Sequence, residues 1–584
     1  MGGGDPAGPF LPAVASAVAG FGRLLIDHQP LDIPIGWWYW NASRVIPDTI
    51  NEFPFFTFTY ADLHAHLMAL PFTLVVIGLA ANFVLRNHED DARLPFLPSL
   101  PISPEDVVEV VVMGLAVGAL RAINYADFAT YQLVIASALA IGEYARHRIS
   151  LAAIIGFAWR LIAVFILAAL LWQPFVSNFA TAYLSIELWN GARTTLSEYL
   201  IVHGIFLFVI ATYLVWQTFD SKAARGPFRF LHMALKRSNR IDHLLTLQRV
   251  LAAPPTVYED WAVVIVFAAM VLEGGFLVLQ LSVFVVAFPL LVLAGLLVLR
   301  PDLEPARRLI ALLIAAGLAL TMMVEVIVYK GDIGRMNTVF KFYLQAWVFF
   351  GIAAAVGVAW MLQMTEHRRQ TTDTAHSPLA TRHSALPGWW WGIFAVLVFA
   401  GLLYPVTAAR AKVNDRFVPG SPPGLNGMDY MKTAVYNDQG HELVLKYDFE
   451  AIQWMRENIQ GSPVVLEGNA PLYRWGSRIA IYTGLPTIIG WDWHEKQQRS
   501  IIDPTIIDRR VATVRDIYDT LDVNTALTEM SQFHVKYIYL GDMERVYYNA
   551  NGLAKFDAML GMGKLKVVYQ NEHVKIYEIM DRVG

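Results

Sequence analysis

Long apolar runs separated by short polar stretches occupy most of the first 405 residues. Because a helix that crosses the hydrocarbon core of a bilayer needs about 20 mainly apolar residues, these runs predict about ten membrane-spanning helices. The predicted spans are residues 66–85, 106–122, 129–145, 151–172, 200–217, 261–279, 281–299, 308–328, 339–362 and 389–405. The stretch 261–299 is nearly continuous, with Glu273-Gly274-Gly275 in its first half and Pro289 in its second, and we interpret it as two helices in a tight hairpin.

The loops between these runs differ in their content of lysine and arginine. Basic residues crowd residues 146–148, 218–260, 300–308 and 363–388, whereas residues 173–199 hold one arginine and no lysine. Since cytoplasmic loops of membrane proteins are enriched in these residues, the basic loops are predicted to face the cytoplasm. The segments predicted to lie outside are 1–64, 123–128, 173–199, 329–338 and 406–584. An outside N-terminus without its own leading helix is unusual, and we expect that a preceding helix is missing from this chain.

Beyond the last span the composition changes. Residues 406–446 are polar with Pro, Gly and Asn, which predicts a linker or irregular loop. Residues 447–584 predict a small soluble α/β domain on the outer side, large enough for a core of its own. Its predicted helices are 448–459, 505–530 and 553–560, and its predicted strands are 463–466, 535–540, 566–569 and 574–579. The predicted organisation is an outer loop (1–64), a transmembrane domain (65–405), this linker and this domain.

Composition supports the membrane class and excludes others. Hydrophobic residues make up 56% of the chain and charged residues only 16%, too few to cover the surface of a soluble protein of this size. The formal net charge is −4, so nothing indicates nucleic acid as a partner. The chain has no cysteine, which excludes disulfides and thiolate metal sites.

The first candidate site lies just before the first span. Two acids, Glu52 and Asp62, and two imidazoles, His64 and His66, follow the polar residue Arg44. If the backbone is extended, alternate side chains share one side, so Asp62-x-His64-x-His66 suits a divalent metal such as Mg or Mn. If it is helical, Asp62 and His66 share a face instead. Asp62 also suits a general base that activates a hydroxyl, and the structural alternative is a polar helix cap at the membrane interface.

The second candidate site lies where the span 339–362 begins. It contains Arg335, Asn337, Lys341 and Gln345, and the last three recur every four residues, so they drift only slowly around one helical face. Two cations beside Asn and Gln suit a phosphate, with Arg as a fork and Lys as a point charge. The alternative is snorkelling of the cations at an interface, which fits Lys341 poorly because an apolar run follows it directly.

Two further groups are weaker. Asn124 and Asp127 in the turn 123–128, and Glu273 within a span, suit either structural pairing or a functional site. In the soluble domain, the sequence Trp491-Asp492-Trp493-His494 is similar in residue type to a carbohydrate-contact surface. It also suits an aromatic seam that docks this domain onto the membrane part.

These motifs together resemble a known family. The stretches Ser43-Arg44, Asn51-Glu52-Phe53-Pro54, Asp62-Leu63-His64, Arg335-Met336-Asn337-Thr338-Val339-Phe340-Lys341 and Gly490-Trp491-Asp492-Trp493-His494 resemble the YYY-type membrane proteins of Chloroflexi and archaea. That family is similar to the GT-C superfamily of polyprenyl-phosphate-dependent glycosyltransferases. The resemblance implies multiple spans, an acidic catalytic motif in the first outer loop and a C-terminal extracytoplasmic domain. Family members usually begin with a membrane helix before the first motif, which this chain lacks.

The resemblance also implies roles for individual residues. Asp62 is the leading candidate for the base and Glu52 the second, while His64 and His66 bind a metal or phosphate. Arg335 and Lys341 hold the lipid phosphate. The expected function is a membrane glycosyltransferase that moves a sugar from a polyprenyl-phosphate donor, a membrane lipid, to an unidentified extracytoplasmic acceptor.

Two other functions compete with this one. A transporter or lipid flippase is suggested by Glu273 and by the broken stretch 261–299, although the chain shows no two related halves. A metal-dependent membrane hydrolase would use Asp62, His64 and His66 as ligands.

Overall fold

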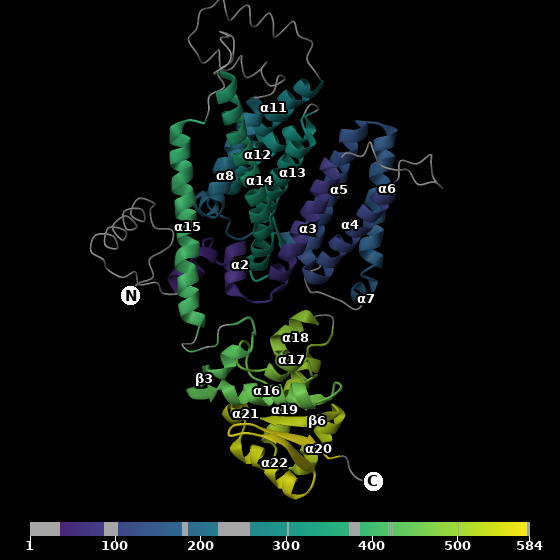
Figure 1. Cartoon of the computed structure of the whole chain (residues 1–584), viewed down its shortest axis with the longest axis vertical. Helices are drawn as coiled ribbons and strands as arrows, with labels where there is room; N and C mark the ends of the chain where they lie inside the picture. The colour runs from purple at the N-terminus through teal and green to yellow at the C-terminus, as the bar shows by residue number, and fades with distance from the viewer. Residues whose placement is uncertain are drawn as a thin grey trace, which may run out of the picture. The chain divides into compact units, whose positions relative to one another are not determined.

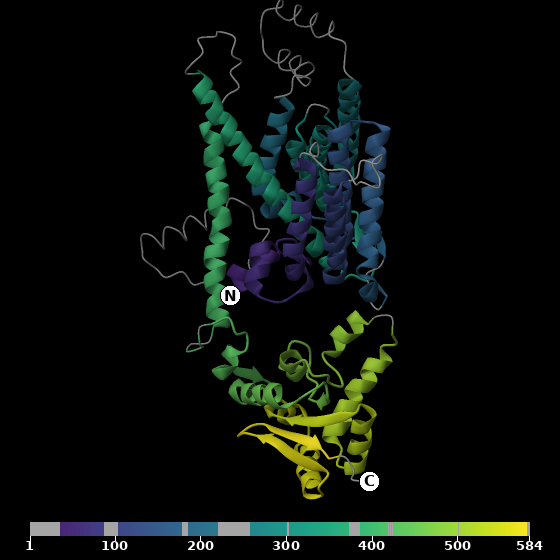
Figure 2. The same ribbon diagram turned by 45° about the vertical axis from the view of Figure 1, so that its right-hand side comes forward.

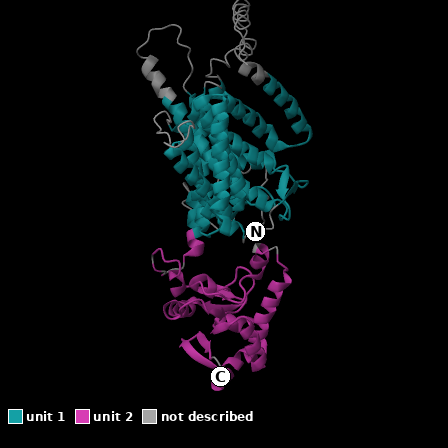
Figure 3. Cartoon of the chain, turned by 90° about the vertical axis from the view of Figure 1, so that its right-hand side faces the viewer, with its two compact units in different colours: residues 1–178, 185–412 teal, residues 179–184, 413–584 magenta. Residues whose placement is uncertain are grey.

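A computed structural model provides the structure of this chain. It describes residues 36–86, 103–177, 185–219, 257–300, 303–372, 386–417, 420, 422, 424–499 and 502–580. Most of the basic loop 218–260 and part of the loop 363–388 therefore lie outside the described residues. The chain divides into two compact units, residues 1–178 with 185–412 and residues 179–184 with 413–584, shown in two colours in Figure 3.

The first unit is a bundle of long helices (Figures 1 and 2). In chain order the helices are α2 (Pro54–Tyr60), α3 (Ala65–Leu85), α4 (Pro104–Ile123), α5 (Tyr125–His147), α6 (Leu151–Leu170), α7 (Gln173–Val176), α8 (Leu196–Phe219), α11 (Val257–Val278), α12 (Ser282–Leu299), α13 (Pro305–Met323), α14 (Met336–Thr372) and α15 (Gly388–Arg416). Two short strands, β1 (Ile186–Leu188) and β2 (Ile327–Tyr329), pair antiparallel. One apolar core runs through the bundle, and Val76, Ile135, Ile314 and Phe349 are buried in it.

Seven helices in the described part of the chain are long and apolar enough to cross a membrane: α3, α6, α8, α12, α13, α14 and α15. The other three predicted spans fall on α4, α5 and α11. Helices α4 and α5 bury charged side chains among their neighbours, including Asp106, Glu109 and Glu143, so their composition is less apolar than that of a lipid-facing helix. Ten spans remain a prediction.

Two predicted boundaries differ from the structure. Helix α15 continues to Arg416, past the predicted linker start at 406, because Ala408, Ala411 and Lys412 are buried and hold its last turns. The segment expected to be irregular also contains a hairpin of strands β3 (Val435–Asp438) and β4 (His441–Val444).

The second unit contains a four-stranded sheet in the order β5-β6-β8-β7. Strand β5 (Val464–Leu466) runs parallel to β6 (Val535–Leu540), whereas β8 (Lys575–Ile579) is antiparallel to both β6 and β7 (Leu565–Gln570). Neighbouring residues on a strand point to opposite faces, so Leu466 packs with one set of helices and Val465 with another. The helices on the first face are α19 (Thr505–Asp519), α20 (Val523–Gln532) and α22 (Ala550–Gly561), and those on the second are α16 (Leu445–Asn458), α17 (Arg478–Thr483) and α21 (Asp542–Tyr547).

The predicted helix 505–530 is interrupted between α19 and α20. The carboxylate of Asp522 accepts hydrogen bonds from the backbone N–H groups of Asn524 and Thr525, so it caps a new helix at that point.

Candidate functional site

Aromatic packing shapes the segment before α3. A π-helical turn (Gly36–Trp40) and a short 3₁₀ turn (Asn41–Ser43) precede α2. The ring of Tyr39 stacks on Phe56 at 4.6 Å, and its hydroxyl donates to the Phe56 carbonyl at 3.1 Å. Ala61 then takes a left-handed conformation with φ 59°, which ends α2 and turns the chain into the extended start of α3. The candidate acids Glu52 and Asp62 lie on either side of α2.

Glu52 and His66 form a buried pair. His66 Nε2 lies 3.1 Å from Glu52 Oε2, and the Thr57 hydroxyl donates to the same oxygen at 2.9 Å. The two side chains are only 12% and 8% exposed. The imidazole also meets the ring of Phe340 edge-on at 4.5 Å, which links the first turn of α3 to α14. This pair therefore fixes the segment before α3 to the helix bundle.

Asp62 and His64 form a second, accessible pair. His64 Nε2 lies 3.4 Å from Asp62 Oδ2, with the two side chains 59% and 49% exposed. The extended backbone does bring the His64 and His66 rings to 5.1 Å, but His66 is bonded to Glu52 and His64 faces Asp62. Within the described residues, no group of three or more His, Asp and Glu side chains is arranged to hold a metal ion. The predicted ligands are thus divided between two pairs.

Arg44 is held within its own turn. Its Nη1 donates to the carbonyl and the hydroxyl of Ser43, at 3.0 and 2.7 Å, and its guanidinium lies 5.7 Å from the centre of the Trp40 ring.

Lys412 of α15 lies in an aromatic cage formed by Tyr39, Trp40 and Tyr60. Its ammonium is 4.5, 5.5 and 4.8 Å from the centres of these rings, and the residue is buried. The Tyr404 hydroxyl, also on α15, donates to the Tyr39 carbonyl at 3.2 Å. Helix α15 is thus tied to both ends of the segment that carries Glu52. No sequence pattern indicated this contact, because Lys412 lies in the predicted linker.

Arg335 is buried and engaged with protein groups. Its Nη1 lies 2.7 Å from Glu325 Oε1, and its Nη2 donates to the Thr194 hydroxyl at 2.9 Å. Thr194 in turn donates its backbone N–H to Glu325 Oε2 at 3.0 Å. The guanidinium thereby joins the residues before β2 to the residues before α8. Its surroundings fit a structural ion pair.

Asn337 belongs to the cap of α14. The two carboxylate oxygens of Asp332 accept hydrogen bonds from the backbone and side chains of Asn337 and Thr338, at 2.8 to 3.1 Å. An anion at this position satisfies the free N–H groups of the first turn. The Asn337 amide is therefore occupied inside the protein.

Lys341 and Gln345 of α14 interact with residues of α5. The charge of Lys341 interacts with that of Asp127, which is buried and accepts from the Asn124 amide at 2.9 Å. One turn further along α14, Gln345 accepts from the Tyr131 hydroxyl at 2.5 Å. The turn residues Asn124 and Asp127 and the α14 cation thus form one polar group.

These two regions lie at the same end of the bundle. His66 is in the first turn of α3, Asp127 is in the first turn of α5, and Lys341 follows Phe340, the residue that His66 contacts, in α14. All three helices begin on the side that the loop charges predict to be outside. The structure therefore places the pair of Glu52 and His66 and the group of Asp127 and Lys341 at one end of the bundle, with Arg335 in a separate ion pair.

The aromatic motif of the second unit lies beside α18 (Asp492–Gln498). The Tyr473 hydroxyl lies 3.2 Å from His494 Nε2, and the rings of Tyr473, Trp491 and His494 pack edge to face at 5.5 to 5.6 Å. Trp493 is exposed, and Asp492 lies 4.0 Å from the Lys496 ammonium. The group forms an aromatic surface with polar neighbours.

Sequence reasoning missed a buried charge cluster in the second unit. Arg478 lies among Asp448, Glu467 and Glu544, with its Nη2 2.8 Å from Glu544. Burial raises the pKa of Glu467 to about 7, against the opposing charge of Arg478. The partners are far apart in sequence, so no local motif marks them. An apolar run likewise conceals His203 of α8, whose ring is fully buried beside Tyr199 and Tyr343.

No curated protein matches the chain in a sequence comparison. Among solved structures, it is similar to the archaeal oligosaccharyltransferase AglB from Archaeoglobus fulgidus, in complex with an inhibitory peptide and a dolichol-phosphate. The identity is 12% and the TM-score 0.31, over 82% of this chain and 52% of that one. A crystal structure of the Archaeoglobus fulgidus oligosaccharyltransferase in the apo form gives 12% identity and a TM-score of 0.33, over 91% and 58%. The chain thus spans little more than half the length of these proteins, and the likeness is coarse.

The comparison with protein families is more direct. The model of one family of uncharacterised membrane proteins, DUF2298, matches residues 4–350, more than half of the chain. The match includes the segment before α3, the turn before α5 and the start of α14. With its apolar helices, the chain is a multi-pass membrane protein. It belongs to the DUF2298 family of membrane proteins.

Proposed function

We propose that this protein is a membrane glycosyltransferase of the GT-C type, as the resemblance to the YYY-type proteins implies. It transfers a sugar from a polyprenyl-phosphate donor to an acceptor on the outer side of the cell membrane, where we also place the second unit. The proposal is based on one observation. The accessible carboxylate of Asp62 stands next to the buried pair of Glu52 and His66, at the end of the bundle where α3, α5 and α14 begin.

Asp62 is the proposed general base. Its side chain is half exposed, so an acceptor hydroxyl can reach it, and His64 on one side restricts its orientation. In the reaction, Asp62 takes the proton of the acceptor hydroxyl, and the hydroxyl oxygen forms the new bond to the anomeric carbon. The bond between that carbon and the phosphate oxygen breaks, and the phosphate leaves with the bonding electron pair.

Lys341 is the proposed partner of the leaving phosphate. A phosphate that gains charge as it leaves is stabilised by a fixed cation. Lys341 lies at the same end of the bundle as Glu52 and His66, whereas the buried Arg335 is paired with Glu325. We therefore assign phosphate binding to Lys341 and a supporting role to Arg335. Glu52 holds His66 and positions the start of α3, and it is the second choice for the base.

A divalent metal is not part of this reaction scheme. Asp62, His64 and His66 do not converge on one point, since His66 turns to Glu52. Magnesium in particular prefers oxygen ligands in octahedral geometry, which a site with two imidazoles does not supply. No step is assigned to a metal.

The test is transfer from a labelled polyprenyl-phosphate sugar in proteoliposomes, measured for the wild type, Asp62→Asn and Asp48→Asn. Asp48 is an exposed acid of the same segment with φ 54°, a conformation that asparagine also tolerates, so it is a matched control. Loss of a general base is expected to lower the rate of transfer by about 100-fold or more. Transfer by Asp62→Asn at the wild-type rate would show that Asp62 is not the base.

A further inference from the structure

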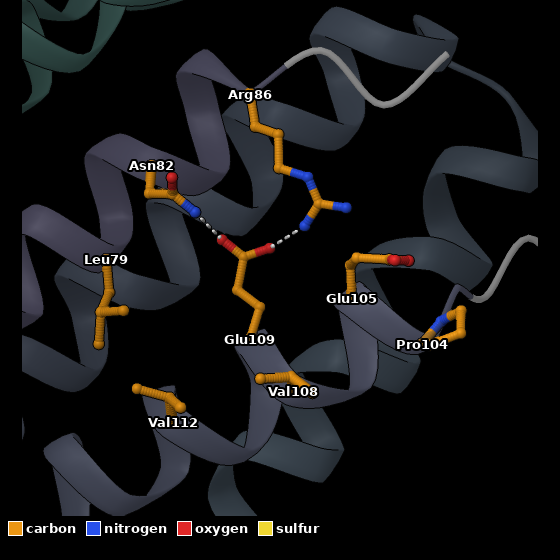
Figure 4. A pocket seen from close by; sticks show the side chains of 8 residues that line it. All are labelled: Leu79, Asn82, Arg86, Pro104, Glu105, Val108, Glu109 and Val112. Atoms are coloured by element: carbon orange, nitrogen blue, oxygen red, sulfur yellow. Dashed lines mark hydrogen bonds and ion pairs between the residues drawn. The ribbon is translucent and has the colours of Figure 1, made fainter. Parts of the chain in front are cut away.

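A groove separate from the outer site lies between α3 and α4. Its volume is about 430 Å³, and it is lined by Leu79, Asn82, Arg86, Pro104, Glu105, Val108, Glu109 and Val112 (Figure 4). These residues come from the last turns of α3 and the first turns of α4. They lie at the opposite ends of these helices from the turn before α5 and from the pair of Glu52 and His66.

The two ends of this groove differ in polarity. Figure 4 shows Arg86 and Glu105 toward one end and Leu79 and Val112 toward the other. Leu79 and Arg86 are seven positions apart, and Pro104 and Val112 are eight positions apart, which corresponds to about 10–12 Å along a helix axis. The groove is therefore amphipathic over a length that fits a headgroup and the start of an acyl chain.

The polar end of the groove is lined by side chains of both signs of charge. The buried carboxylate of Glu109 accepts from the Asn82 amide at 2.8 Å and lies 3.4 Å from Arg86 Nη1, so it holds the guanidinium at the rim. A guanidinium has five N–H donors and binds a phosphate while it keeps a carboxylate partner. Glu105 is exposed, and no hydrogen bond or ion pair to it is found among the described residues.

The apolar end of the groove is exposed beside a helix that is able to cross a bilayer. Helix α3 is one of the helices able to cross a bilayer, and Val108 and Val112 are exposed at the groove. The polar end sits at the last residues of α3, where a spanning helix reaches the headgroup layer. The neighbour expected in this position is a lipid.

We propose that this groove binds one phospholipid whose headgroup carries a primary amine and a phosphate, as in phosphatidylethanolamine. Arg86 binds the phosphate, Glu105 binds the ammonium, and an acyl chain lies along Leu79, Val108 and Val112. The pair of opposite charges at the polar end selects a zwitterionic headgroup over an anionic one. Glu105 is the residue that distinguishes a headgroup with an ammonium group from one without it.

Native mass spectrometry of the full-length protein in detergent tests this proposal. Phosphatidylethanolamine, phosphatidylglycerol with the same acyl chains and a polyprenyl phosphate are added in turn. Phosphatidylethanolamine is expected to bind with one-to-one stoichiometry and about tenfold more tightly than phosphatidylglycerol. Glu105→Gln is expected to remove this preference, and Arg86→Gln is expected to weaken the binding of both phospholipids. The matched control is Glu304→Gln, an exposed acid at the start of α13 that lies outside the groove.

Equal binding of the two phospholipids to the wild type would overturn the proposal, as would a preference unchanged in Glu105→Gln. Tighter binding of polyprenyl phosphate, insensitive to Glu105→Gln, would show that the groove is a donor-lipid site and would also overturn it. Glu105 is exposed in the first turn of α4, so we expect its substitution by Gln to leave the fold intact and the result interpretable. The outcome is independent of the glycosyltransferase assay.

Discussion

His66 Nε2 lies 3.1 Å from Glu52 Oε2, and this buried contact joins the segment before α3 to the helix bundle. Through the edge-on contact of His66 with Phe340, the same pair reaches α14, where Lys341 follows. Because Asp62 lies between α2 and α3, we expect its position to depend on both connections.

Glu52→Gln is expected to destabilise the protein by about 1 kcal/mol. The substitution keeps the shape of the side chain but removes its charge, and hydrogen bonds to a charged group are about twice as strong as neutral ones. Thermal unfolding in detergent measures the change, with Asp48→Asn as the amide control at an exposed site. Equal unfolding temperatures for both variants and the wild type would argue against a stabilising pair.

Lys412→Met is expected to lower stability by about 1–2 kcal/mol, since the ammonium loses its contacts with three aromatic rings. Lys412→Arg keeps a cation at the rings and should retain much of the stability. Because Tyr60 lies two residues before Asp62, Lys412→Met should also reduce the turnover number of sugar transfer. A variant as stable and as active as the wild type would exclude the proposed anchoring of this segment by α15.

Arg335→Met is expected to destabilise the first unit by about 3–5 kcal/mol, because it leaves the buried carboxylate of Glu325 without its cation. Adding Glu325→Leu should restore part of this loss, since no uncompensated charge then remains. Denaturant unfolding of the single and double variants makes the comparison. If Arg335→Met is stable but fails to bind donor lipid, Arg335 is a phosphate ligand and the structural assignment is wrong.

The stability of the second unit is expected to fall as the pH rises from about 5 to about 7.5. Burial raises the pKa of Glu467 to about 7 from an ordinary value of 4.5, so the folded state binds this proton more tightly than the unfolded state. The resulting stabilisation is complete below pH 4.5 and is lost as the pH passes through 7. Unfolding temperatures across this range should decline in the wild type and change less in Glu467→Gln. Identical pH profiles would contradict the role of Glu467.

The apolar runs predicted most of the membrane helices, because length and hydrophobicity alone determine whether a helix can span. The same pattern also predicted spans at α4 and α5, which are less apolar because their buried acids pair with Arg160 of α6, a contact that no local pattern shows. The early end assigned to the last span has a similar cause. Lys412 looks like the start of a polar linker, yet it is buried among aromatic rings from the other end of the chain.

The candidate site was predicted in part. The sequence indicated Glu52, Asp62 and His66 because acids and imidazoles gathered before an apolar run, and the structure places them in two neighbouring pairs. It grouped Arg335 with Lys341 because they are close in sequence. Their partners belong to different elements, Glu325 to the residues before β2 and Asp127 to α5, and that division depends on tertiary packing. Helical spacing alone does not show which neighbour each cation meets.

The most direct test of the central claim follows the label itself. Proteoliposomes containing the wild-type protein, a labelled polyprenyl-phosphate sugar and a crude acceptor fraction are separated into lipid, free sugar and acceptor-bound sugar. We expect the label to move from lipid to acceptor in the wild type and in Asp48→Asn, and to stay in the lipid in Asp62→Asn. Label that remains in the lipid with the wild type, or that appears only as free sugar, would contradict it.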